Sequence, residues 1–375
     1  VFLGFSGSEF AAVLGASPAG GSVYAATGAS ASIAAGRLPY ALGLHGPCVS
    51  HDTACSAALA ASHAGLRALQ LAECSAGVVM GVTLMLSPGV GTSFAIAGMT
   101  SPAGRSHTFD ARADGYARGE ACVAVALMAH DADGDSRAGG AAVGGCAVRC
   151  DGRSASLTAP NGQAQQGLLA AALADASAAA DELALSEAHG TGTALGDPIE
   201  AGSLAAAVLA RRGAACAALA VGGVKANIGH AEPAAGMTGL LKLAVGLAAG
   251  GAAPNAQLRL LNPHVESKLS GAMPHRRTRM VCEGIHCVAH HSCTDDCSQL
   301  AARARPQGAR AVRRGANPNP PRLEEGAKSQ KGASEGRSQF MSVRNLLFIW
   351  NKVPSLNNGS VIVPARLLTM DVVIL

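Results

Sequence analysis

Aromatic side chains are scarce in this sequence, at 3% of its 375 residues, although 49% of the residues are hydrophobic. A core with so few rings must be built from Ala, Val and Leu, and the 47 glycines allow helices and strands to approach one another closely. Long hydrophobic runs are lacking too, since none reaches the roughly 18 to 20 residues needed to cross a bilayer. The composition therefore predicts a globular protein without a membrane span.

The sequence also lacks an initiator methionine and a basic segment ahead of its first apolar residues. It begins with Val1, already inside the apolar stretch Val1–Phe5. A secretory signal peptide would begin with a positively charged region, so this start is not interpreted as one. We expect a fragment whose true start lies upstream.

Basic charge is lacking from most of the chain, although the whole sequence has a formal net charge of +4. Residues 1–265 carry 13 Lys and Arg against 17 Asp and Glu, a net charge of −4. Residues 266–375 carry 16 against 8, a net charge of +8. Because all of the basicity comes from the last stretch, we expect no nucleic-acid partner.

Three familiar kinds of ligand site are missing. No Gly-Lys-Ser/Thr exists for a P-loop, and the glycine run 139–145 precedes no helix suited to a dinucleotide. The Cys and His residues between Cys282 and Cys297 have spacings that match none of the paired zinc patterns. The sequence predicts neither a metal site nor a bound cofactor.

Cysteine, in contrast, is plentiful, with 11 residues. The chain is not a short secreted scaffold, the setting in which many cysteines imply disulfides. A reducing compartment, and hence an intracellular and by default cytoplasmic location, is expected. Seven cysteines lie in Ala- and Val-rich surroundings and are expected to be mostly buried small hydrophobic residues, namely Cys48, Cys55, Cys74, Cys122, Cys146, Cys150 and Cys216.

Apolar runs of strand length alternate with helix-like runs as far as about position 265. The expected strands are Val1–Phe5, Gly77–Val82, Ala121–Met128, Ala141–Val148, Leu183–Ala188 and Leu219–Gly222. The expected helices are Ala31–Ala41 (ending near Pro39), Ser56–Cys74, Gln163–Ala180, Ile199–Ala210 and Ala234–Ala249. This alternation predicts an α/β protein with a largely parallel sheet in each half.

The composition divides the chain into three parts. Residues 1–135 and 136–265 form the two halves, joined near the polar, Gly-rich stretch 131–140. Beyond about Pro263 alanine becomes rarer, and residues 303–336 are rich in charge, Pro and Gly. Such a stretch cannot bury enough apolar surface to order itself, so residues 266–375 are expected to form a divergent, disordered tail of non-domain origin.

Three side chains in separate segments carry reactive chemistry. Cys55 comes directly before the expected helix at Ser56, where peptide N–H groups and the helix dipole stabilise a thiolate. His189 follows an expected strand and enters a Gly- and Thr-rich segment, and His230 precedes a helix that starts with Pro233. Taken singly, they could be an inert buried cysteine, a surface-loop histidine and a capping residue. Together they favour nucleophilic catalysis.

At this point the sequence resembles the β-ketoacyl synthases of polyketide and fatty acid assembly, over roughly residues 1–265. The resemblance is closest to polyketide synthase ketosynthases. The segments that carry it are 36–47, Asp52–Ala57, Phe109–Glu120, Leu157–Gly162, Glu187–Glu200 and Val224–Gly236.

The resemblance implies a thiolase-like fold of two related α/β halves with αβαβα layers, of which the C-terminal half is incomplete. It implies Cys55 as the acyl acceptor, and His189 and His230 as donors to the malonyl thioester oxygen. It further implies that Lys225 supports the site electrostatically and that Thr191 and Thr193 bind a phosphopantetheine arm.

The activity implied is decarboxylative condensation of an acyl thioester with malonyl-acyl carrier protein. The carrier protein delivers the phosphopantetheine arm, no cofactor or metal is bound, and a homodimer is expected. Two departures from the family pattern stand out. The strand and turn expected before the nucleophile are absent, and so is the C-terminal Gly-rich loop, of which Asn357–Ser360 is only a weak echo.

Other functions remain open from the sequence. One is an inactive or truncated ketosynthase-like protein, and another is a non-condensing relative, although such relatives usually lack the equivalent of Cys55. A third is a Cys/His thioester hydrolase, which would need a base that holds the thiol directly and a third orienting group.

Overall fold

The computed structural model describes residues 1–7, 9–129, 141–156, 158–271, 279–282, 285–288 and 368–374. Its strands are β1 (Phe2–Gly4), β2 (Val49–His51), β3 (Ala76–Thr83), β4 (Ala121–Ala129), β5 (Ala141–Val143), β6 (Leu185–Glu187), β7 (Ala220–Gly222), β8 (Arg279–Cys282), β9 (Ile285–Val288) and β10 (Leu368–Ile374). Its α-helices are α1 (Glu9–Gly15), α2 (Ala25–Gly28), α3 (Ala31–Leu42), α4 (Ala57–Gln70), α5 (Pro88–Ile96), α6 (Gly162–Asp175), α7 (Gly196–Ala207), α8 (Lys225–Ile228), α9 (Ala235–Ala248) and α10 (Pro263–Gly271). Short 3₁₀ helices lie at η1 (Pro18–Gly21), η2 (Ala180–Glu182), η3 (Leu209–Arg211) and η4 (Glu232–Ala234).

The first sheet has the strand order β2-β1-β3-β4-β10-β5. Strands β2, β1 and β3 are parallel, whereas β4 is antiparallel to β3 and β10 is antiparallel to both of its neighbours. The prediction of a largely parallel sheet is therefore wrong for this half. Ala121, which begins β4, lies opposite Thr83, which ends β3. The chain thus enters β4 at the same edge of the sheet where it left β3. A parallel pairing would require a crossover back to the edge where β3 starts, and the chain makes none here.

The second sheet has the order β6-β7-β8-β9. Here β6, β7 and β8 are parallel and β9 pairs antiparallel with β8. His189 and Lys225 follow the ends of β6 and β7, so both reach the same edge of this sheet.

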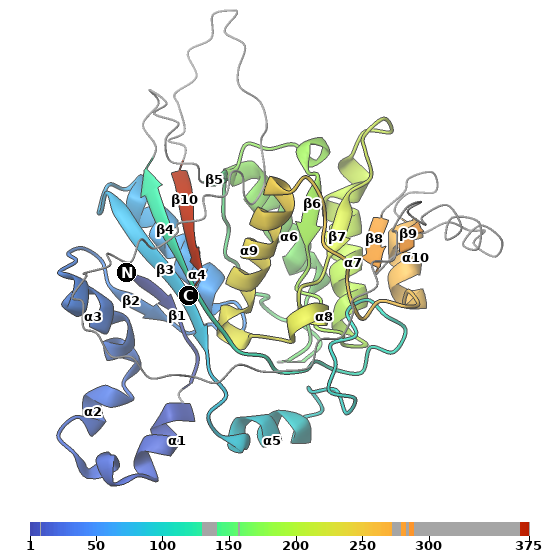
Figure 1. The fold of residues 1–375 in the computed structure, drawn as a ribbon. Coiled ribbons are helices and arrows are strands. Elements are labelled where there is room, and N and C mark those ends of the chain that lie inside the picture. The colour runs from blue at the N-terminus through green and yellow to red at the C-terminus, as the bar shows by residue number, and fades with distance from the viewer. Residues whose placement is uncertain are drawn as a thin grey trace, which may run out of the picture. The chain divides into compact units, whose positions relative to one another are not determined.

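Helices α4 and α9 share one core with the first sheet. Ala58 and Leu66 of α4, Val79 of β3 and Met237 and Leu240 of α9 are all buried in it. Helix α9 also packs on β6, so α4 and α9 lie between the two sheets, as Figure 1 shows for α9. A second core joins β7 to α6, α7 and α10 on the far side of the second sheet. Together with α3 on β1 and β2, these layers confirm the predicted α/β architecture.

Small residues allow the close packing that the composition predicted. A side chain at Gly4 of β1 would meet the backbone of Ala58 at 2.3 Å, and one at Gly81 of β3 would meet the Ala58 Cβ at 2.8 Å. The start of α4 is thus pressed against β1 and β3, and this contact fixes the position of Cys55, which precedes it. Glycine at position 4 is required for that approach.

Several predicted element ends are shifted. Helix α3 continues through Pro39 to Leu42 and ends at Gly43, which adopts the left-handed conformation with φ of 64°. The strand predicted as Ala141–Val148 stops at Val143, and the helix predicted as Gln163–Ala180 stops at Asp175. Away from these ends, the elements predicted up to position 265 are present.

The prediction that the scattered cysteines are mostly buried is wrong. All seven are free, and none is fully buried. Cys48, Cys122 and Cys150 are exposed, and Cys55, Cys74, Cys146 and Cys216 are half-buried. Cys122 shows why, because Val123, Val125 and Leu127 fill the buried face of β4 and the alternation of the strand turns Cys122 outward.

The three-part division of the chain stays a prediction. Within the predicted tail the structure describes most of α10 and the strands β8, β9 and β10. The connection at 131–140, the Cys and His side chains between Cys282 and Cys297, and the segment Asn357–Ser360 lie outside the described residues or side chains. Among the helices described, none combines the length and hydrophobicity needed to span a bilayer.

Candidate active site

Cys55 lies in a strained turn just before α4. Ala54 has a φ of 52°, a conformation that non-glycine residues rarely adopt. Its N–H group bonds to a carboxylate oxygen of Asp52 at 3.0 Å, and the N–H group of Ala57 bonds back to the Ala54 carbonyl. Such strain persists only where the surroundings enforce it. The turn leaves Cys55 half-buried at the N-terminal end of α4.

His189 approaches the Cys55 sulfur from the second sheet. Its Nε2 atom lies 4.0 Å from the Cys55 Sγ atom, although the two residues are 134 positions apart. The loop after His189 depends on glycine, since Gly192 has a φ of 74° and a side chain there would meet the His107 nitrogen at 2.7 Å. A tight turn at this position keeps the imidazole at the end of β6.

Lys225 fixes the orientation of the His189 ring. The Lys225 Nζ atom lies 2.5 Å from the His189 carbonyl oxygen and 3.4 Å from the His189 Nδ1 atom. Lysine can only donate, so Nδ1 accepts and the proton of the neutral ring resides on Nε2. The N–H group of His189 therefore points toward Cys55.

His230 has the same proton arrangement by a different contact. The backbone N–H group of Glu232 donates to the His230 Nδ1 atom at 3.0 Å, which leaves the proton on Nε2. The rings of His189 and His230 are 5.4 Å apart and nearly perpendicular, at 86°. One polar atom from each of Cys55, His189 and His230 lies within 4.8 Å of the others. The structure thus brings together the three residues singled out in the sequence.

Both histidines are neutral at physiological pH. Burial, with a second contribution from the Lys225 ammonium, lowers the pKa of His189 to about 3. With this pKa the His189 ring is neutral at pH 7. Burial, Lys225 and His189 lower the pKa of His230 to about 2. The site therefore offers two neutral N–H donors beside a thiol.

The spacing of these three side chains would also suit a metal ion. The proton positions fit a resident metal poorly, because a metal needs the lone pair of the imidazole nitrogen that faces it. In His189 and His230 the Nδ1 lone pairs accept hydrogen bonds from Lys225 and Glu232, and the Nε2 atoms carry protons. The arrangement suits hydrogen-bond donation to an oxygen better than metal ligation.

Two further carboxylates, the buried Asp197 and the half-buried Glu200, hold the backbone around His189. Glu200 accepts the N–H groups of His189 and Gly190 at 2.6 and 2.8 Å. Asp197 accepts those of Phe109 and Gly192 at 2.7 and 3.1 Å, and burial raises its pKa to about 7. Both lie in the first turns of α7. An acidic pair there, directly after a Gly- and Thr-rich loop, is the signal that could have identified them.

Thr191 and Thr193 lie on the loop that follows His189. Their hydroxyl oxygens are 3.3 Å apart, and the Thr193 hydroxyl also accepts the Gly196 N–H group at 3.1 Å. Both residues are half-buried. Their proposed binding of a pantetheine arm stays a prediction.

The Cys55 thiol should react faster as pH rises, and Lys225 should assist it. Burial raises the pKa of this thiol, and the Lys225 ammonium partly offsets that rise. The reactive thiolate is the minor form at pH 8 and increases as pH approaches the raised pKa. We expect iodoacetamide alkylation of Cys55 to keep rising beyond pH 9 and to slow about threefold to tenfold at pH 8 in Lys225→Met.

Peptide mass spectrometry would follow Cys55 separately from the other cysteines, and Lys268→Met, which removes an exposed lysine of α10, is the matched control. A profile for Cys55 that levels off below pH 8, or an unchanged rate in Lys225→Met, would contradict this assignment of the charge.

Comparison with known proteins gives one consistent result. The family model "Beta-ketoacyl synthase, N-terminal domain" matches residues 1–132, and "Beta-ketoacyl synthase, C-terminal domain" matches residues 140–259. A phenolphthiocerol/phthiocerol polyketide synthase of Mycobacterium tuberculosis is 44% identical over 263 residues, which are 70% of this chain and 12% of that protein. The spectinabilin polyketide synthase system protein NorC of Streptomyces orinoci is 42% identical over 269 residues, which are 71% of this chain and 12% of that protein. The chain thus spans only a small part of these curated relatives.

Solved structures agree with the sequence comparison. The ketosynthase from module 6 of the bacillaene synthase of Bacillus subtilis matches with a TM-score of 0.63 and 32% identity, over 70% of this chain and 45% of that one. An oxazolomycin ketosynthase domain of Streptomyces albus matches with a TM-score of 0.66 and 30% identity, over 75% of this chain and 48% of that one. These matches confirm the predicted thiolase-like fold. The chain spans less than half the length of these solved structures.

Proposed function

Because the chain belongs to the β-ketoacyl synthase family, we propose that it catalyses decarboxylative condensation of an acyl thioester with a malonyl thioester. The observation that carries this proposal is the convergence of the His189 and His230 imidazoles, each with a hydrogen-bond donor facing Nδ1, on the Cys55 sulfur, with one polar atom of each residue within 4.8 Å of the others. Preorganised donors aimed at developing negative charge are usually the largest single contribution to catalysis.

The first step would load Cys55. The Cys55 thiol gives up its proton, and the thiolate attacks the carbonyl carbon of an acyl thioester to form a new S–C bond. The bond from that carbon to the carrier sulfur breaks, and the carrier thiolate leaves and takes up a proton. The helix N-terminus and the Lys225 cation stabilise the thiolate, and the N–H group of His189 at 4.0 Å faces it.

The second step would form the nucleophilic carbon. When the malonyl thioester loses CO₂, the electron pair of the broken C–C bond passes into the thioester and leaves an enolate. The enolate oxygen would accept hydrogen bonds from the N–H groups of His189 and His230, whose rings are neutral because their pKa values are lowered. The enolate carbon then attacks the acyl carbonyl on Cys55, which forms the new C–C bond and releases the thiolate.

The proposed partner is an acyl carrier protein that delivers both thioesters on a phosphopantetheine arm. Thr191 and Thr193 are proposed to hold this arm, since their half-buried hydroxyl groups lie two and four residues beyond His189. Phosphopantetheine thioesters are therefore the substrates to test.

A Cys/His hydrolase is supported less well. In such an enzyme the imidazole takes the thiol proton through an unprotonated Nε2, and a carboxylate or amide oxygen accepts from Nδ1–H. At His189 the polarity is reversed, because Lys225 donates toward Nδ1.

The deciding experiment supplies an acyl phosphopantetheine thioester together with a malonyl-carrier protein and analyses the products by mass spectrometry. The condensing enzyme forms a 3-oxoacyl thioester and one CO₂ per turnover. Release of the free acyl acid without CO₂ would favour hydrolysis and overturn the proposal.

A homodimer is also proposed, through the edge of the first sheet. Strand β2 ends this sheet, and in the part of the chain that the structure describes its outer edge has no strand partner. Val49 on β2 is 42% exposed, and the preceding Tyr40 and Leu42 are 93% and 63% exposed. An open strand edge beside apolar side chains is suited to pairing with a second copy about a twofold axis.

Light scattering after size exclusion should give twice the chain mass for the unaltered protein. Val49→Lys should shift it to the monomer, because a lysine would be placed at the paired edge. Val148→Lys changes a valine that is 53% exposed in the second half and should remain dimeric. A monomeric unaltered protein, or a dimeric Val49→Lys, would argue against this interface.

A further inference from the structure

The segment 117–119 holds the backbone of His230 on both sides. The His230 N–H group donates to the Ala117 carbonyl at 2.6 Å, and the Gly119 N–H group donates to the His230 carbonyl at 2.9 Å. These two bonds form a short parallel bridge centred on Arg118 and His230. The backbone position of His230 is therefore set by a segment that lies far earlier in the chain.

The His230 ring is held by a second, separate contact. The Glu232 N–H group that donates to Nδ1 belongs to a residue with a φ of 41°, in the left-handed region that non-glycine residues avoid. Such a backbone conformation persists only where neighbouring contacts enforce it. The proton position of His230 therefore depends on what holds Glu232.

Arg118 is the group that holds Glu232. Its Nε atom and one terminal nitrogen bond to the two Glu232 carboxylate oxygens at 2.5 and 3.0 Å, in a bidentate pair. The side chains of Arg118 and Glu232 are only 11% and 16% exposed, so water screens the pair weakly. One residue thus lies at the centre of the backbone bridge to His230 and also fixes the residue that orients its ring.

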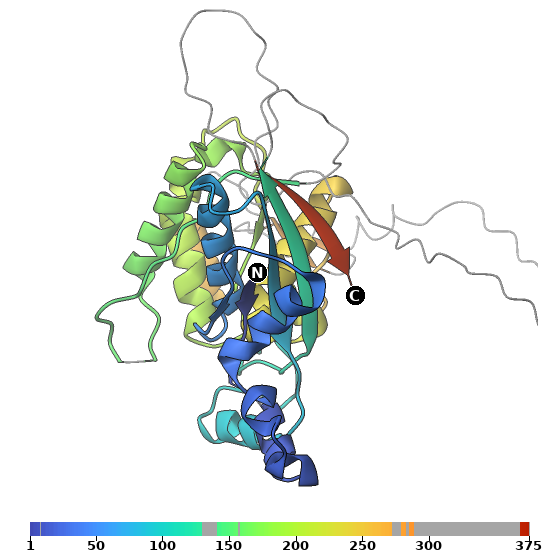
Figure 2. The same cartoon turned by 90° about the vertical axis from the view of Figure 1, so that its left-hand side faces the viewer.

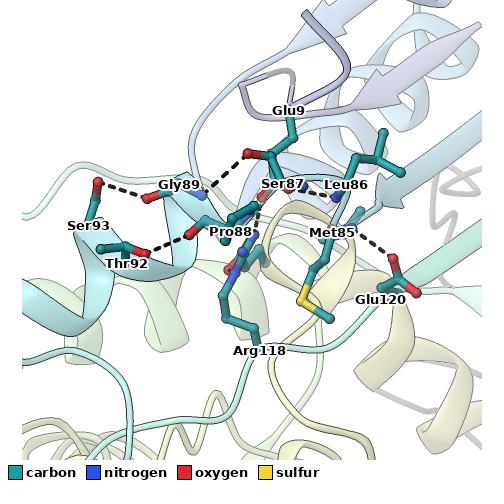
Figure 3. Close-up of polar contacts among 12 residues, drawn as sticks. Glu9, Met85, Leu86, Ser87, Pro88, Gly89, Thr92, Ser93, Arg118 and Glu120 are labelled. Carbon is teal, nitrogen blue, oxygen red and sulfur yellow. Dashed lines mark hydrogen bonds and ion pairs between the residues drawn. The ribbon is translucent and has the colours of Figure 1, made fainter. Parts of the chain in front are cut away.

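Glu9 anchors Arg118 from the opposite direction. A Glu9 carboxylate oxygen bonds to Arg118 at 2.7 Å, and the other accepts the N–H groups of Leu86 and Ser87, each at 2.7 Å. Figure 3 shows Glu9 between Arg118 and the segment that leads into α5. Figure 2 shows α1, which begins at Glu9, close to α5 at the lower end of the view. The guanidinium is therefore fixed by carboxylates from two separate parts of the chain.

We propose that Arg118 is a positioning residue for His230. Arg118 acts through Glu232 to keep the Nε2–H group of His230 aimed at the reacting oxygen. This inference rests on the proposed function and extends it to a residue that does not contact the reacting atoms. Loss of the bidentate pair lets the strained Glu232 peptide relax, so that its N–H group no longer selects one tautomer of His230.

Arg118→Gln should lower kcat for decarboxylation of a malonyl phosphopantetheine thioester about 10- to 100-fold, with KM within about twofold. Arg118→Lys keeps the positive charge but lacks the planar guanidinium, so its kcat should fall between that of the unaltered enzyme and that of Arg118→Gln. The matched control is Arg67→Gln, which breaks the Arg67–Asp175 ion pair away from the site and should stay within about twofold of the unaltered enzyme.

Nitrogen NMR of ¹⁵N-histidine-labelled protein supplies a readout that does not depend on turnover. The His230 signals, assigned with His230→Gln, should show one tautomer with an unprotonated Nδ1 in the unaltered protein and a mixture in Arg118→Gln. Glu232→Gln is the second variant, to be used if Arg118→Gln folds poorly. It retains the N–H group and one bond to Arg118, so it should show the same change to a smaller extent.

A single unchanged tautomer in both Arg118→Gln and Glu232→Gln, or an unchanged kcat in Arg118→Gln, would overturn this inference. Absence of decarboxylation in the unaltered protein would instead refute the proposed function, and the tautomer measurement would still judge the role of Arg118.

Discussion

Replacing Cys55 by alanine is expected to abolish the acyl-enzyme and to lower the condensation rate by more than about 10³-fold. The physical reason is that Cys55 alone among the three central residues can form a covalent thioester. After incubation with an acyl phosphopantetheine thioester, intact-protein and peptide mass spectrometry should find the acyl mass on Cys55 and none in Cys55→Ala. Decarboxylation of a malonyl thioester should survive in Cys55→Ala, because it uses the imidazole donors.

The control for this experiment is Cys122→Ala, which removes an exposed cysteine on β4. That variant should acylate like the unaltered protein. Acyl mass that persists in Cys55→Ala, or that appears on another cysteine, would show that Cys55 is not the nucleophile.

Replacing either His189 or His230 by alanine is expected to slow malonyl decarboxylation about 10²- to 10³-fold, the usual cost of one lost donor to a developing oxyanion. Each variant removes one of two Nε2–H groups that would face the same oxygen. The double variant should lose less than the product of the two single losses, because residues in direct contact couple. Acylation of Cys55 should fall less than decarboxylation in each variant.

His45→Ala, in the exposed turn after α3, provides a matched control and should decarboxylate normally. If His189→Ala and His230→Ala both keep the full rate of CO₂ release, the proposed donor roles are wrong.

The same two residues predict the pH dependence of decarboxylation. An imidazole donates in its neutral form, and a lowered pKa keeps it neutral at every pH above that value. With the pKa of His189 at about 3 and that of His230 at about 2, acidification from pH 8 to pH 5 should not charge either ring. A rate that falls as pH drops through 6.5 would indicate a histidine of ordinary pKa acting as a base, as a hydrolase requires.

Much of the fold could be predicted because helix and strand patterns are local. Helix α4 lies within the predicted 56–74, and β3 and β4 each extend the predicted strand by one or two residues. The antiparallel entry of β4 could not be predicted, since it depends on the path taken by residues 97–120, which carry no regular periodicity. The exposure of Cys48, Cys122 and Cys150 was missed for a related reason. Ala-rich flanking sequence does not indicate which face of a strand or loop packs against the core.

The candidate site was predictable only in part. Cys55, His189 and His230 stand out because each combines a reactive side chain with local helix-start or glycine-turn chemistry. Glu200 and Asp197 accept hydrogen bonds from backbone N–H groups, and Arg118 binds the carboxylate of Glu232. These partners are brought together only when the chain folds. Charged residues are common on protein surfaces, so nothing in the local sequence distinguishes these three residues from charged side chains that only face solvent.

The sequence by itself determined the alternation of elements, the Ala- and Gly-based packing, the family resemblance and the side chains to be examined. Only the tertiary structure decided where the protons of His189 and His230 reside. The reason is that a ring nitrogen donates or accepts according to the group across from it. Here these groups are Lys225, which is 36 residues from His189, and the strained peptide of Glu232, which Arg118 holds from 114 residues away.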